Sequence, residues 1–303
     1  IMFCSDDKHP DNLAISHINE LAAKAVAKGK DVFNVLRAAC LNPIAHYSMN
    51  VGQLREGDSA DFILVNNLKD FKVMSTYIDG EKVSENGKTL IQPITNEIIN
   101  NFHTSIKKPE DFQLKAHGSK VRVIEALDGQ LITPEISGEI LIKDGFAESN
   151  TDQDILKITV VNRYEDAAPA VAFIKNFGLK TGAIASSVGH DSHNIIAVGI
   201  DDESICKAVN LIIAAKGGVS AVSGNQEEIL PLPVGGIMSA SDGYEVAAAY
   251  TRIDRLAKEM GATLNSPFMT LSFMALLVIP DLKLSDKGLF NGQKFEFEEV
   301  FFE

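Results

Sequence analysis

The stretch IMFCSDDKHP, residues 1–10, decides the fold class, because an apolar run leads directly into an acidic turn. We expect residues 1–4 to form a strand buried on both faces, as in a parallel sheet covered by helices. Asp6 and Asp7 would then follow the end of that strand. Such a strand needs neighbours on both sides, and none precedes it here, so we expect the chain to be a piece of a longer polypeptide.

Two helices are predicted after this turn. Ser16 can cap the first, whose apolar residues recur with a helical period from Ile18 to Val26 and which Gly29 ends. The second helix can begin at Asp31 and stop at the pair Asn42-Pro43. A strand, an acidic turn and two helices form the closing pattern of a β/α unit.

The pattern changes at about residue 50. Residues 62–65 and 73–78 read as strands, and Asp79-Gly80 after the second is a strong hairpin signal. From about residue 96 the pattern is mixed. Further strands are predicted at 155–161, 182–188 and 194–200, and further helices from Asp202 to Gly217 and over 243–260.

The composition excludes several classes of function. The formal net charge is −13, from 28 basic and 41 acidic residues, which argues against a nucleic-acid or anionic membrane surface. The longest apolar stretch, residues 268–280, is too short to span a membrane. The three cysteines are widely spaced, which favours reduced thiols in a cytoplasmic protein over disulfides or a thiolate zinc site.

The acidic pair Asp6 and Asp7 has two readings. A carboxylate at the end of a barrel strand can bind a metal ion and exchange a proton with metal-bound water. The same two residues can simply begin a turn before a helix, since aspartates are common in turns. Spacing leaves both readings open.

A second polar cluster, HDSHN at residues 190–194, lies between two predicted apolar strands. His190 and His193 can bind a metal if the loop curls, or line a substrate pocket together with Asp191 and Asn194. A third reading is a hydrogen-bonded loop that holds the two strands together. His9 either faces a pocket from the Asp6 turn or is exposed.

Five stretches resemble one family. FCSDDKHP (3–10) resembles the last barrel strand and following loop of adenine deaminases in the amidohydrolase superfamily, and GQLREGDSADFIL (52–64) resembles the superfamily signature that leads into its β-sandwich. Residues 182–195, 230–239 and 267–273 resemble the C-terminal domain particular to adenine deaminases. The blocks occur in the family's order, so the resemblance covers essentially the whole chain.

The resemblance implies an α/β fold in three parts. Residues 1–50 would be the last β/α element of a (β/α)8 metal-dependent hydrolase barrel, and residues 51–95 part of a β-sandwich. Residues 96–303 would form a separate mixed α/β C-terminal domain. Asp61, within the superfamily signature, is expected to hold a tight turn.

The resemblance also implies an activity, the hydrolysis of adenine to hypoxanthine and ammonia by a metal-bound hydroxide. The metal would be divalent, manganese or iron, with zinc as the other possibility. Asp6 would ligate it and shuttle a proton, with Asp7 as the alternative for this catalytic role. The substrate pocket or lid would be formed by His190, Asp191, His193, Asn194 and His9.

One departure from the family pattern matters. None of the seven histidines forms the His-x-His pair of the family, so most metal ligands would lie outside this chain and the isolated chain would be inactive. Two alternatives stay open: an amidohydrolase acting on another purine or a cyclic amide, and a non-catalytic module for purine binding or oligomerisation. The expected partners are adenine and further copies of the chain in a homo-oligomer.

Overall fold

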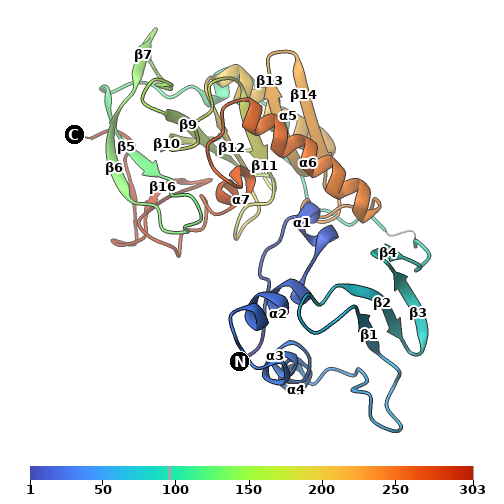
Figure 1. Ribbon diagram of the computed structural model, residues 1–303. Coiled ribbons are helices and arrows are strands. Elements are labelled where there is room, and N and C mark those ends of the chain that lie inside the picture. Colours follow the sequence, from blue (N-terminus) through green and yellow to red (C-terminus); the bar gives the residue numbers. More distant parts are fainter. Residues whose placement is uncertain (95–96, 303) are drawn as a thin grey trace. The chain divides into compact units, whose positions relative to one another are not determined.

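The computed structural model describes residues 1–94 and 97–302, so the expected boundary between residues 95 and 96 lies outside the described residues. The chain divides into two compact units, Ile1–Thr95 with Asp242–Ala247, and Asn96–Ser241 with Ala248–Glu303. Helices and several sheets together give the α/β class that was expected (Figure 1). None of the helices in the described ranges is long and apolar enough to cross a membrane.

The elements before residue 95 are helices and a small sheet. In chain order they are α1 (Pro10–Ile15), α2 (Ile18–Ala27), α3 (Val32–Leu36), a π-helical turn (Arg37–Leu41), α4 (Asn42–Tyr47), β1 (Phe62–Val65), β2 (Val73–Ile78), β3 (Glu81–Glu85) and β4 (Lys88–Thr89). The strands form one antiparallel sheet in the order β1-β2-β3-β4. A small buried cluster of Ala22, Val35 and Phe71 lies in this unit.

The strand expected over residues 1–4 is wrong. This segment is irregular, Ile1 is fully exposed, and the backbone N–H of Phe3 donates to the carbonyl of Ala38 at 3.2 Å. A strand needs at least one neighbouring strand to satisfy its backbone groups. The described residues place no strand beside this segment.

The expected end of the second helix at Asn42-Pro43 is also wrong. The start is as expected, because the Asp31 carboxylate accepts the N–H of Asn34 at 3.0 Å. The helix then widens into the π-helical turn, where the N–H of Asn42 reaches back to Arg37. This shift puts Pro43 in the first turn of α4, where a missing N–H costs no helical hydrogen bond.

The hairpin between β2 and β3 forms as the sequence predicts. Both strands β1 and β2 have the expected bounds, and Asp79 and Gly80 take φ values of 50° and 80° at the turn. The Asp61 carboxylate accepts the N–H of Gly52 at 2.7 Å and that of Asp79 at 2.8 Å. These backbone bonds lower the pKa of Asp61 and confirm that it holds a turn.

After residue 96 the chain is mainly β. Its elements are a 3₁₀ turn (Pro109–Phe112), β5 (Lys120–Glu125), β6 (Glu135–Glu139), β7 (Leu141–Lys143), β8 (Phe146–Glu148), β9 (Ile155–Val161), β10 (Ala170–Lys175), β11 (Ala183–Ser186), β12 (Ile195–Gly199), α5 (Asp202–Ala215), β13 (Gly218–Ser223), β14 (Gln226–Pro231), α6 (Gly243–Glu259), α7 (Pro267–Ser272), β15 (Leu282–Ser285), β16 (Gly288–Asn291) and β17 (Glu296–Glu298). An eight-stranded sheet has the order β14-β13-β11-β12-β9-β10-β5-β6 and is antiparallel except between β10 and β5.

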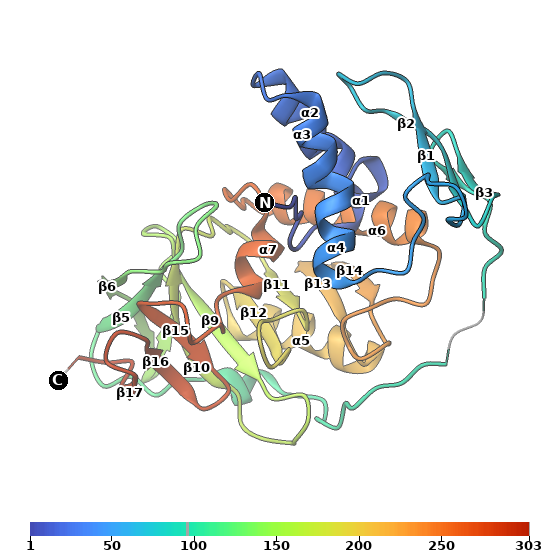
Figure 2. The same ribbon diagram turned by 90° about the horizontal axis from the view of Figure 1, so that it is seen from below.

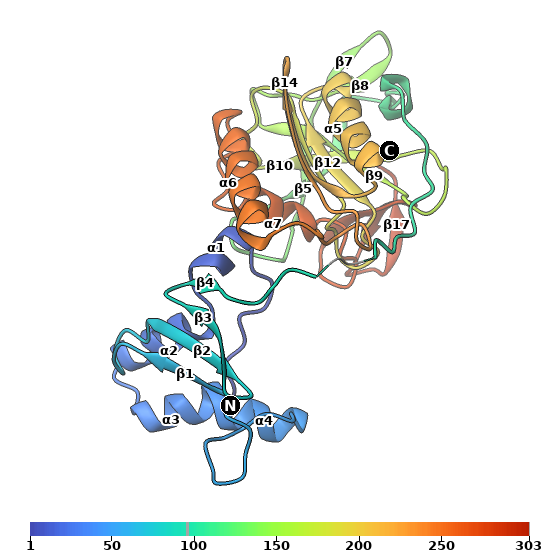
Figure 3. The same cartoon turned by 90° about the vertical axis from the view of Figure 1, so that its right-hand side faces the viewer.

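Helices cover both faces of this sheet, so its central strands are buried on both faces. Figure 3 shows α5 on one side of the strands and α7 on the other. Every residue of β9, β11 and β12 is buried. The small sheet β15-β16-β17 lies against β9 and β10 (Figure 2), through β15 and β16.

Candidate functional site

The turn that carries Asp6 and Asp7 lies at the surface of the first unit. Asp6 has a left-handed backbone, φ 54°, and its carboxylate accepts the N–H of Asp7 at 2.9 Å. Ser5 Oγ, on the same turn, lies 2.7 Å from Nε2 of His17, the residue that precedes α2. Both aspartates are exposed, so the geometry is that of a polar turn with two accessible carboxylates.

His9 stands immediately before α1 as its N-cap residue, followed by Pro10. Its carbonyl accepts the N–H of Leu13 at 2.9 Å, and its side chain is half-buried. The neighbouring Lys8 donates from Nζ to the carbonyl of Ser16 at 2.6 Å, which ties the turn to the end of α1.

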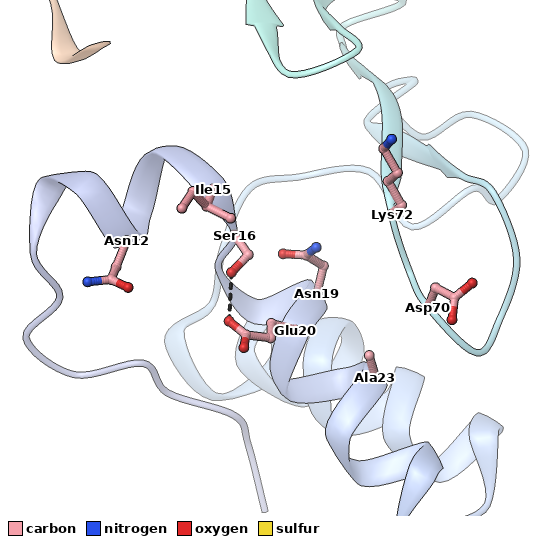
Figure 4. Close-up of a pocket in the computed structure, with 8 residues that line it drawn as sticks. All are labelled: Asn12, Ile15, Ser16, Asn19, Glu20, Ala23, Asp70 and Lys72. Atoms are coloured by element: carbon pink, nitrogen blue, oxygen red, sulfur yellow. Dashed lines mark hydrogen bonds between the residues drawn. The ribbon is translucent and has the colours of Figure 1, made fainter. Parts of the chain in front are cut away.

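A hollow of about 400 Å³ opens in the first unit between the α1–α2 corner and the segment before β2 (Figure 4). It is lined by Asn12, Ile15, Ser16, Asn19, Glu20, Ala23, Asp70 and Lys72. On the α2 side of the hollow, the Glu20 carboxylate already has two partners. It accepts a hydrogen bond from Ser16 Oγ at 2.6 Å and forms an ion pair with Lys24 at 2.8 Å. None of the predicted site residues lines this hollow.

The loop between β11 and β12, residues 187–194, curls back on itself. The N–H of His193 donates to the carbonyl of Gly189 at 2.6 Å, and the N–H of Gly189 donates to His193 Nδ1 at 3.3 Å. The imidazole rings of His190 and His193 are 5.6 Å apart. Both imidazoles are half-buried, and Asp191 between them is exposed.

The His190 side of this loop rests on the C-terminal end of α7 and on Phe273, which follows it. The N–H of His190 donates to the carbonyl of Ser272 at 2.7 Å, and its imidazole stacks on the Phe273 ring at 4.6 Å with an angle of 22°. The predicted pocket residues His190, Asp191 and His193 therefore share one loop, beside the ring of Phe273, which was not among the residues predicted for the site.

The Asn194 end of the loop is held by the segment that follows β9. Asn194 is buried, and its Oδ1 accepts the N–H of Arg163 at 3.2 Å. Arg163 Nη1 donates to the carbonyl of Gly235 at 2.7 Å, and Tyr164 Oη donates to the carbonyl of Ser192 at 2.7 Å. The three sequence blocks 182–195, 230–239 and 267–273 thus meet at this loop.

A metal site is not complete within this part of the molecule. Among residues 1–94 and 97–302, no group of three or more His, Cys, Asp or Glu side chains is arranged to hold a metal ion. Asp6 offers one exposed carboxylate and the loop offers two imidazoles, each in its own unit. The described residues alone therefore do not fit a closed divalent metal site.

Comparison with known proteins decides the family. Residues 130–296, more than half of the chain, match the adenine deaminase C-terminal domain family. The chain belongs to the adenine deaminase family. Residues 1–83 match the amidohydrolase family, as the resemblance of residues 3–10 and 52–64 implied.

Several curated proteins named adenine deaminase are similar to this chain. The protein of Sulfurovum sp. (strain NBC37-1) is 56% identical over 298 residues, which is 98% of this chain and 54% of the relative. The proteins of Salinibacter ruber and Borreliella burgdorferi are 49% and 46% identical, over 99% and 98% of this chain and 55% of each relative. The chain spans about half the length of these relatives.

Proposed function

We propose that this chain acts as the C-terminal part of an adenine deaminase, which hydrolyses adenine to hypoxanthine and ammonia. The observation that supports this most directly is the convergence of the three blocks that resemble the C-terminal domain of the family on the loop of His190 and His193. The amidohydrolase match over residues 1–83 includes the turn of Asp6. The resemblance of residues 3–10 to the family implies an acidic site residue at this turn.

Asp6 is proposed as the acidic corner of the active site. An exposed carboxylate suits a hard divalent cation such as manganese or iron, with zinc as the alternative, as one ligand of several. Such a metal, when bound, supplies water that ionises near neutral pH. Asp6 would hold a proton at a carboxylate oxygen and pass it to the amino group that leaves as ammonia, with Asp7 as the alternative.

The remaining ligands would come from a part of the polypeptide outside this chain. The chain alone is therefore proposed to be inactive, although it contains the complete His190 loop between β11 and β12. In that loop the imidazoles of His190 and His193 can donate to or accept from purine ring nitrogens. Asp191 can accept from an amino group, and Asn194 fixes the loop from below.

A fusion tests this proposal. The N-terminal part of the Sulfurovum relative is joined to this chain, and ammonia release from adenine is measured with metal content. We expect turnover in the fusion, none in the chain alone, and a loss of about 100-fold or more in kcat for Asp6→Asn, the range of general acid–base groups. Asp11→Asn, in the neighbouring helix α1, is the matched control and should retain activity.

The outcome that contradicts the proposal is specific. If Asp6→Asn and Asp7→Asn together leave turnover and metal content unchanged, the acidic corner does not lie at this turn. A panel of purines and cyclic amides in the same fusion tests the substrate, and a preference for another ring would replace adenine in the proposal.

A further inference from the structure

A buried arginine lies beneath the His190 loop. Arg163 lies two residues after the end of β9 and is 5% exposed, yet it makes no ion pair with any residue in the described part of the chain. A buried guanidinium without a carboxylate is costly unless other groups accept its hydrogen bonds. The acceptors that Arg163 uses show what the position does.

Those acceptors belong to the loop and its neighbour. Nη1 donates to the carbonyl of Gly235, and Nη2 donates to Tyr164 Oη at 2.8 Å. The Tyr164 hydroxyl then donates to the carbonyl of Ser192, between His190 and His193. The guanidinium also lies 4.7 Å from the centre of the Tyr164 ring, so the tyrosine is held by its face and its hydroxyl.

The glycine pair Gly235-Gly236, in block 230–239, lies against the Arg163 guanidinium. Gly236 has φ 75°, and a Cβ built on it would lie 1.6 Å from Arg163 Nη1. A side chain at this position would displace the guanidinium from where it lies. Ser187 Oγ, at the start of the loop, donates to the carbonyl of Gly236 at 2.6 Å. The glycine turn, Arg163 and the loop therefore form one connected network.

We infer that Arg163, acting through Tyr164, is a positioning residue that fixes the His190 loop in the shape that contacts the purine. The inference rests on the proposed function, because the loop matters for catalysis only if it lines the adenine pocket. Arg163 does not touch the reacting atoms in this assignment. It uses a planar fork of donors, which lysine lacks, to hold a loop carbonyl through the tyrosine and the glycine turn at once.

The first test measures the loop itself by amide hydrogen exchange on this chain. Tyr164→Phe removes one hydroxyl, and we expect peptides over residues 187–194 to exchange about 3- to 10-fold faster, the value of one net hydrogen bond. Peptides of β9 should not change. Arg122→Lys is the matched control, because Arg122 pairs with Glu135 and Glu298 on the β5 side of the sheet. Unchanged loop exchange in Tyr164→Phe and Arg163→Lys would overturn the inference.

The second test separates this inference from the proposed function. In the active fusion, Tyr164→Phe should raise KM for adenine about 3- to 10-fold and leave kcat within about twofold, with a larger KM effect in Arg163→Lys. Arg122→Lys should leave both constants unchanged. A faster-exchanging loop with an unchanged KM would remove the loop from the adenine pocket. An unchanged loop in a fusion that still hydrolyses adenine would overturn the positioning role and leave the function standing.

Discussion

The two units of this chain bury their apolar side chains to very different degrees. In the first, the buried cluster consists of Ala22, Val35 and Phe71, while Ile15 is 84% and Phe33 72% exposed. In the second, whole strands of the eight-stranded sheet are buried between helices. Burial of apolar surface is the main favourable term in folding, so the second unit carries most of the stability. The proposed acidic corner lies in the unit that has the weaker core.

Separating the units gives the largest expected effect. Residues 96–303 alone should unfold in one cooperative transition in urea, because the sheet and its covering helices remain together. Residues 1–95 alone should show no cooperative transition, because the four buried apolar residues Ala22, Val35, Ala38 and Phe71 do not offset the loss of backbone entropy. Circular dichroism during urea titration measures both. A cooperative transition in residues 1–95 would contradict the conclusion that the second unit carries most of the stability.

The buried charge pair under α5 gives the next largest effect. Lys157 on β9 is fully buried, and its Nζ donates to Asp202 Oδ1 at 2.6 Å, with Glu148 at 3.7 Å. Lys157→Met should lower the free energy of unfolding by about 3–5 kcal/mol, because it leaves Asp202 buried without a partner. Urea denaturation of the chain measures this change.

A paired replacement shows whether the cost comes from the lone charge. Lys157→Met with Asp202→Leu should recover most of the lost stability, since a buried ion pair can be replaced by apolar side chains at little cost. The exposed pair of Lys258 and Asp254 is the control, and Lys258→Met should change the free energy of unfolding by no more than ~0.5 kcal/mol. Equal effects of both single substitutions would contradict a dominant role of burial.

The sequence predicts elements that are decided locally. The bounds of β1, β2 and β9 were as expected, because apolar runs and turn residues mark them without help from distant parts. The prediction of a strand over residues 1–4 was wrong because a strand forms only beside another strand, which the local sequence does not reveal. The helix passes Asn42-Pro43 because a π-helical turn, which leaves no clear sequence signal, moves the proline to a tolerated position.

The residues of the candidate site also fall into two groups, those that local sequence marks and those whose roles depend on distant residues. The polar loop at residues 190–194 was visible as a group of polar residues between two apolar strands, and its place between β11 and β12 is as predicted. Arg163, Tyr164 and Phe273 were missed, because their roles arise from contacts with residues tens of positions away. The one available signal was a polar run, Asn162 to Tyr164, directly after a buried strand.

A second buried lysine in the second unit predicts a pH effect. Lys283 on β15 is fully buried and donates to the carbonyl of Leu131 at 2.7 Å, and burial lowers its pKa to about 8 from 10.5. Between those values the unfolded chain binds more protons, so the free energy of unfolding should rise with pH from 8 to 10.5, by ~3 kcal/mol at most. Urea denaturation at pH 7.5 and 10.5 measures the rise.

The comparison of variants isolates Lys283 from other groups that titrate in this range. Lys283→Met should remove the rise that the lysine causes, and the exposed Lys258→Met should keep it. If both variants follow the original chain, the burial of Lys283 does not disfavour its charged form.

The smallest expected effect concerns the ion pair of Glu20 and Lys24. It tests whether surface charges stabilise the first unit, which has few buried apolar residues. Bonds from Lys24 and Ser16, with the charge of Lys24, lower the pKa of Glu20 from 4.5 to about 2. The stabilising contribution is therefore complete above pH 4.5 and is lost as the pH falls through about 2. A ¹³C NMR titration of the Glu20 carboxyl should give a midpoint near 2. Lys24→Gln should raise it toward 4.5, whereas Lys28→Gln, one turn further on α2, should not. Because Glu20 is exposed, 0.5 M salt should also raise the midpoint, as it screens Lys24. A midpoint near 4.5 in the unaltered chain would mean that the α1–α2 corner is held by packing after all.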